Sequence, residues 1–204
     1  MTWPTTTITP GAGTTIYTLP GGGQRVSGDS LSIANPSDAA FFSTSSITRK
    51  ANTTTYTAFT GWNATSATVF TFTSVGARNG QQIAIVGIDI WSSANPTLLL
   101  QGALWLFSVT PGTIIADDAT FTIASGDFAN LTGGCFGAGI PFTLVNNQAA
   151  AAANSGVSLT PGPSLIATLG GSSTSLFGMV EVINAYVPVS AEVLTINLHT
   201  VGLN

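Results

Sequence analysis

Hydrophobic and polar residues alternate with a period of two in several short stretches of the chain. The alternation is clearest at residues 67–73, 82–91 and 194–199. This period places successive side chains on opposite sides of a β-strand. Asn79-Gly80 and Pro111-Gly112 are typical of tight turns, and Asn95-Pro96 separates two long strands. About eight or more short strands at this spacing, without a capped apolar period of 3.6 residues, predict an all-β, jelly-roll β-sandwich.

Residues 1–45 differ from the rest of the chain. Breakers such as Pro20-Gly21-Gly22-Gly23 and Asn35-Pro36 separate short pieces that favour β-structure. This pattern fits either an extended N-terminal arm or the first hairpin of the sandwich. As an arm it would bind a neighbouring protein through its apolar residues Trp3, Ile8, Ile16, Tyr17 and Leu19. Residues 46–204 then form the jelly-roll domain, in which the alanine-rich segment 148–154 is a short helix or, as its neighbours favour, a surface loop.

The chain carries very little charge. Charged residues make up 6% of its 204 residues, and the net charge is −4. So few cations cannot form the basic stripe that a nucleic-acid backbone requires, and we expect no nucleic-acid partner. The longest apolar runs, at residues 83–91 and 98–109, are interrupted and shorter than the ~20 apolar residues of a membrane-spanning helix, so we expect no membrane partner. The first residues lack the pattern of a signal peptide, which predicts synthesis in a cytoplasm.

A set of short segments follows a fixed order from residue 78 to the end of the chain. The segments are 79–80, 88–95, 104–107, 111, 116–121, 139–142, 175–180, 185–190 and 194–201. In order and spacing they resemble the jelly-roll head decoration (cement) proteins of tailed bacteriophages and prophages. The chain departs from that family where Tyr56-Thr57-Ala58 runs into Phe59-Thr60-Gly61 in place of Gly-Asp, and the region before residue 46 is additional.

This resemblance implies a structural virion protein and no enzyme. A decoration protein made in the host cytoplasm would bind the major capsid protein on the outer surface of the head and stabilise the lattice. The resemblance also implies a homotrimer, because the related proteins sit on local threefold axes. Such a role needs no catalytic residue, cofactor or metal ion.

The candidate reactive residues fit structural roles better than catalytic ones. His199, the one histidine, alternates with Leu194, Ile196 and Leu198, which predicts a partly exposed side chain on the polar side of a strand. Cys135, the one cysteine, lies in the glycine-rich segment Gly133-Gly134-Cys135-Phe136-Gly137 and is expected to be a small packed side chain.

The acidic residues form one further candidate site. Asp117-Asp118, with Asp127 nearby, could bind Ca²⁺ or could cap turns, and turn capping is favoured because the alternating pattern of a calcium loop is missing.

The rival interpretation is a receptor-binding or carbohydrate-binding jelly roll on a phage tail or fibre. Trp62 is expected at a loop tip, where it could stack on a sugar or bind a protein partner, and Tyr56 is a second stacking candidate. Trp91 and Trp105 lie in apolar strands and are expected in the core. The number of copies per virion separates the two interpretations, because a decoration protein is nearly as abundant as the major capsid protein.

Overall fold

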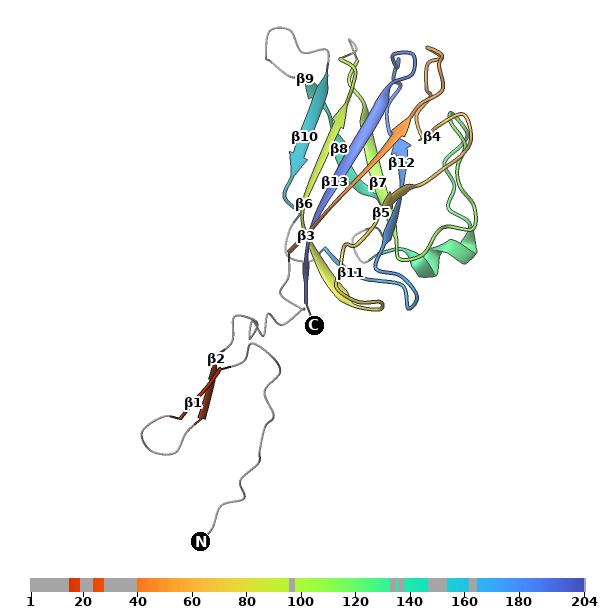
Figure 1. Ribbon diagram of the computed structural model, residues 1–204. Coiled ribbons are helices and arrows are strands. Elements are labelled where there is room, and N and C mark those ends of the chain that lie inside the picture. Colours follow the sequence, from red (N-terminus) through yellow and green to blue (C-terminus); the bar gives the residue numbers. More distant parts are fainter. Residues whose placement is uncertain are drawn as a thin grey trace.

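A computed structural model describes residues 15–18, 24–27, 40–95, 98–132, 135, 138–146, 154–161 and 165–203. Most of the regular structure in these residues is β-strand, arranged in two layers (Figure 1). The strands are β1 (Thr15–Thr18), β2 (Gln24–Ser27), β3 (Ala40–Thr48), β4 (Thr60–Trp62), β5 (Phe70–Phe72), β6 (Gln82–Ser92), β7 (Gln101–Phe107), β8 (Ile140–Thr143), β9 (Val145–Asn146), β10 (Ser155–Leu159), β11 (Ile166–Thr168), β12 (Leu176–Val182) and β13 (Val193–Gly202). A short 3-10 helix, η2 (Ser125–Asn130), precedes β8.

Eight of these strands form the sandwich as two antiparallel sheets, β3-β13-β6-β10 and β4-β12-β7-β8. Their pairing is nested: β3 pairs with β13, β4 with β12, β6 with β10, and β7 with β8. In chain order, the first of the eight strands thus pairs with the last, the second with the second-to-last, and so on inward to β7 and β8. This strand order is that of a jelly roll, and it confirms the predicted fold class. The short strands β9 and β11 extend the first sheet, and β5 extends the second.

The core lies between the two sheets and follows the period-two pattern of the sequence. In β5, Phe70 and Phe72 are buried while Thr71 between them is exposed. In β13, Leu194, Ile196 and Leu198 are fully buried. Apolar side chains from both sheets meet in one cluster, which includes Ile47, Trp62, Phe70, Phe72, Ile83, Ile85, Ile88, Ile90, Leu104, Leu106, Val180, Leu194, Ile196 and Leu198. Burial of this apolar surface is the main force that holds the two sheets together.

A β-bulge changes the alternation within β6. Gly87 pairs with His199 of β13. The next pair joins Thr200 to Ile85, which leaves Val86 as an extra residue that is 46% exposed. Beyond the bulge the even-numbered residues of β6 face the core, and the odd-numbered residues face outward.

The first described strands form a small sheet of their own. β1 pairs with β2, and neither pairs with another described strand. The sandwich begins with β3 at Ala40, a few residues before the boundary at 45/46 that the sequence suggested. The other residues before 40, and residues 147–153 in the alanine-rich region, lie outside the described residues. The N-terminal arm therefore stays a prediction.

Candidate binding face

The outer side of the β3-β13-β6-β10 sheet carries a regular array of polar side chains, which we call the outer polar face. The strand registers place its residues in three rows, and from β3 towards β10 these are Ser46, Thr195, Trp91 and Gly156; Thr44, Asn197, Asp89 and Ser158; and Phe42, His199 and Gly87. Only Asp89 and His199 among them are ionisable. The outer polar face is thus almost uncharged.

Hydrogen bonds between side chains join the strands across this face. The Thr44 hydroxyl donates to the Asn197 side-chain oxygen at 2.7 Å. The hydroxyls of Ser46 and Thr195 lie 2.8 Å apart and share a second bond. Because these polar groups are already paired, a partner can cover them without leaving them unsatisfied.

The one ionisable pair of the outer polar face joins β13 to β6. Nε2 of His199 lies 2.9 Å from a carboxylate oxygen of Asp89, and the two side chains are 40% and 35% exposed. A hydrogen bond from Ser158, followed by the bond from His199, lowers the pKa of the Asp89 carboxyl below its usual value. The Phe42 ring and the imidazole form a T-shaped pair with 4.9 Å between ring centroids. His199 is therefore a partly exposed strand residue, as predicted.

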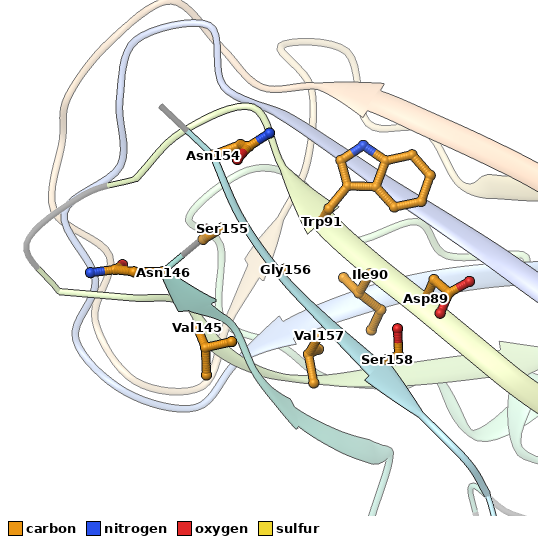
Figure 2. Close-up of a pocket in the computed structure, with 10 residues that line it drawn as sticks. All are labelled: Asp89, Ile90, Trp91, Val145, Asn146, Asn154, Ser155, Gly156, Val157 and Ser158. Carbon is orange, nitrogen blue, oxygen red and sulfur yellow. The ribbon is translucent and has the colours of Figure 1, made fainter. Parts of the chain in front are cut away.

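A notch in the outer polar face lies over Gly156 (Figure 2). In the strand register Gly156 stands between Trp91 of β6 and Val145 of β9. These two neighbours are 38% and 57% exposed, whereas Gly156 has no side chain to fill the space between them. The resulting pocket of about 450 Å³ is lined by residues 89–91, 145–146 and 154–158. This volume lies in the usual range of small-molecule sites, ~300–1,000 Å³.

The structure corrects three predictions about aromatic residues. Trp62 lies in β4 rather than at a loop tip and is 1% exposed, because pairing of β4 with β12 turns it into the core beside Phe70. Tyr56 is fully buried, so neither residue is available for stacking on a sugar. The prediction that Trp91 belongs to the core is also wrong, because it faces outward beyond the bulge in β6. Trp105, by contrast, packs against the core as expected.

The remaining predicted contact residues belong to the N-terminal region. Trp3, Ile8 and Leu19 lie outside the described residues. Ile16 and Tyr17 are part of β1, of which only the strand pairing is described. Their contacts with a partner stay predictions.

Cys135 lies outside the strands and packs against β7, whereas His199 belongs to β13 in the other sheet. The Cys135 sulfur is fully buried and accepts a hydrogen bond from the backbone N–H of Leu106 in β7 at 3.3 Å. Burial raises the pKa of its thiol. His199 instead bonds Asp89 on the outside of the other sheet. Cys135 is a packed side chain, as predicted, and the two residues do not form a nucleophile–base pair.

A buried polar cluster, which we call the Arg49 cluster, joins the segments that flank β3 and β13. The Arg49 Nε donates to the Tyr56 hydroxyl at 2.6 Å, and Nη1 donates to the Asn52 carbonyl at 2.6 Å. The Tyr56 hydroxyl in turn donates to Asp117, whose carboxylate lies 3.6 Å from Arg49 Nη2. The side chains of Arg49 and Asp117 are only 0% and 9% exposed.

Glu192 forms the second half of the Arg49 cluster. It is 1% exposed and accepts hydrogen bonds from the hydroxyls of Ser92 and Tyr186. The Tyr186 ring stacks on Tyr56 with 6.0 Å between centroids, and the Arg49 backbone N–H donates to the Glu192 carbonyl at 2.8 Å. Arg49 and Asp117 are therefore paired with each other, and Glu192 accepts two hydrogen bonds, as buried charges require.

The candidate acidic residues have separate roles. Asp117 belongs to the Arg49 cluster, whereas Asp127 accepts hydrogen bonds from the backbone N–H groups of Gly112 and Thr113 at 2.8 and 3.2 Å. Asp127 thus caps the predicted turn at Pro111-Gly112. Within the described part of the chain, no three His, Cys, Asp or Glu side chains come together in a metal-binding arrangement.

We expect the sandwich to lose stability as the pH rises above about 10, the usual pKa of tyrosine. Burial, together with Asp117 and Glu192, raises the pKa of Tyr56 and Tyr186 well above this value. The stabilisation is fully present below the unfolded-state pKa and is lost at higher pH, because the unfolded chain ionises first. Absorbance and circular dichroism, followed together in an alkaline titration, should show that these two phenols ionise only as the protein unfolds. Their ionisation near pH 10 in the folded protein would contradict this burial.

Comparison with known proteins finds neither a family model nor a curated protein that matches the chain. Among the described residues, no helix has the length and apolar character needed to cross a membrane.

Proposed function

We propose that this protein is a structural component of a tailed-bacteriophage virion that binds the outer surface of the head lattice and stabilises it. The outer polar face is the observation that carries this proposal. Phe42 is 59% exposed and Trp91 is 38% exposed on a face whose polar groups are largely paired with one another. Aromatic side chains that project from such a surface are typical anchors of protein interfaces. The resemblance of the sequence to head decoration proteins favours the major capsid protein as the partner.

The stabilisation follows from binding to the assembled shell alone. A ligand that binds the assembled lattice, but not its free subunits, shifts the equilibrium towards assembly by mass action. Many copies on one shell, each making weak contacts, would bind by multivalency. The rigid jelly roll supplies the fixed footprint that such repeated contacts need.

We also propose that the protein acts as a homotrimer on local threefold axes of the lattice. Its low charge gives little repulsion between copies, and association would bury some of its exposed apolar side chains. Light scattering of the purified protein and of protein released from virions should give the mass of a trimer. A monomer in both preparations would contradict the trimer.

The experiment that tests the proposed function is a pelleting assay with heads that lack the protein. We expect the protein to bind assembled heads but not dissociated capsid subunits. Because the outer polar face is almost uncharged, binding should change little between about 0.05 and 0.5 M salt. Phe42→Ala should weaken binding by about tenfold or more, the effect of losing one interface anchor.

Phe128→Ala is the matched control for the pelleting assay. Phe128 is 46% exposed in η2, away from the outer polar face, so its loss should leave head binding unchanged. Equal binding to free subunits, or a steep fall in binding with salt, would contradict the proposal.

A further inference from the structure

We infer that the notch over Gly156 is a binding site for a neutral oligosaccharide, with the Trp91 indole as the platform for one sugar ring. This site goes beyond the proposed head binding and does not depend on it. Because Trp91 belongs to the outer polar face, a sugar bound here and the head lattice would compete for that residue. Figure 2 shows that the notch is built by three strands: Trp91 and Asp89 come from β6, Val145 and Asn146 from β9, and Ser158 from β10.

The walls of the notch suit the apolar side of a sugar ring. Trp91 and Val145 flank Gly156 in the same row of the sheet, so their side chains stand on either side of a gap. The indole offers a large, rigid apolar surface at little entropic cost, against which the C–H groups of a pyranose can pack.

The neighbouring row supplies polar groups for sugar hydroxyls. The Asp89 carboxylate accepts a bond from His199 at 2.9 Å and is 35% exposed, so it has further capacity to accept hydrogen bonds from hydroxyl groups. Ser158 lies opposite Asp89 in this row, and its hydroxyl bonds the Asp89 carboxylate. A few polar groups beside an aromatic wall are typical of sites for small polar ligands.

The charge of the notch favours a neutral ligand. Asp89 is the one ionisable residue among those that line it. Its carboxylate would repel an anionic ligand, and the lowered pKa of Asp89 keeps that carboxylate ionised near neutral pH. A single carboxylate provides too few oxygen ligands to hold Ca²⁺ by itself.

Gly156 is the residue that keeps the notch open. A Cβ added at this position would lie 3.2 Å from both the Ile90 carbonyl oxygen and the Trp91 Cβ, closer than most such contacts. A larger side chain here would occupy the space beside the indole. This position therefore offers a variant that blocks the notch while leaving Trp91 in place.

The test titrates full-length protein with neutral trisaccharides of glucose, galactose, mannose and N-acetylglucosamine, followed by tryptophan fluorescence and calorimetry. We expect at least one of them to bind with a Kd of about 1 mM, a typical strength for a shallow site. Trp91→Ala and Gly156→Val should each weaken that binding by about tenfold or more. Phe128→Ala, which removes an exposed aromatic ring outside the notch, should bind as the native protein does.

Melting curves and near-UV circular dichroism of all variants show whether each one folds. Gly156→Ala, which adds only one methyl group, keeps the test valid if Gly156→Val does not fold. The inference is overturned if the native protein binds no trisaccharide at about 20 mM, or if Trp91→Ala binds as well as the native protein. If the native protein binds no sugar, and Trp91→Ala and Gly156→Val bind heads less tightly than the native protein, the notch instead receives a capsid side chain.

Discussion

Replacing Arg49 with methionine should destabilise the sandwich by about 3–5 kcal/mol, the usual effect of removing one partner from a buried ion pair. The Arg49 side chain is fully buried. Its loss leaves Asp117 without its cation and the Asn52 carbonyl without its side-chain donor. Methionine fills a similar volume, so the loss of stability would reflect the unpaired polar groups rather than a cavity. For a chain of this length the melting temperature should fall by about 6–20 °C.

The neighbouring cation provides the control for this substitution. Lys50 is exposed, so Lys50→Met removes the same charge but should change the stability by less than about 0.5 kcal/mol. Arg49→Lys keeps the charge but loses the planar set of donors, and its stability should lie between that of Arg49→Met and that of the native protein. A melting temperature of Arg49→Met within about 2 °C of the native value would contradict the role given to the Arg49 cluster.

Deleting residues 1–30 should leave a folded jelly roll whose occupancy on capsids falls steeply. The deletion removes β1 and β2, which pair only with each other among the described strands, whereas the sandwich starts at Ala40. The melting temperature should therefore change little. Occupancy should fall because an N-terminal arm that orders on a neighbour contributes strand pairing and buried apolar side chains to binding.

Variants of full length test whether the apolar side chains of the arm, rather than its length alone, account for occupancy on capsids. Replacing Trp3, Ile8 and Leu19 with serine should lower occupancy, whereas replacing Thr5, Thr6 and Thr7 with serine should not. Thermal melts and capsid pelleting measure the two effects. If the deletion unfolds or aggregates the protein, the first residues belong to the sandwich as a hairpin and the arm hypothesis is wrong.

The strands could be predicted from the sequence because each buries one side. The alternations at residues 67–73, 82–91 and 194–199 correspond to β5, β6 and β13, and Asn79-Gly80 forms a turn in which Gly80 has a φ of 69°. The helix η2 was not predicted, since six residues of 3-10 helix contain no apolar period. Alternation alone does not state which strands pair; the number and spacing of the strands predicted the jelly roll, and the family resemblance implied the same fold.

The candidate site was harder to predict because exposure depends on sheet pairing. Trp62 follows a glycine in a threonine-rich segment and resembles a loop residue, yet pairing with β12 buries it. Trp91 sits in an apolar run, yet it faces outward. Asp89 lies two residues earlier and is polar, and this spacing was the one sign in the sequence that Trp91 faces outward. Asp117, Tyr186 and Glu192 lie far from Arg49 in sequence, so no local pattern could have brought them into its cluster.

The number of copies per virion tests the central claim most directly. Quantitative mass spectrometry of purified virions, supported by cryo-EM of the heads, measures this number against that of the major capsid protein. Head decoration predicts a copy number close to that of the major capsid protein, with density for the jelly roll on the outer surface of the lattice. A few tens of copies or fewer, with density on the tail, would contradict the proposed function.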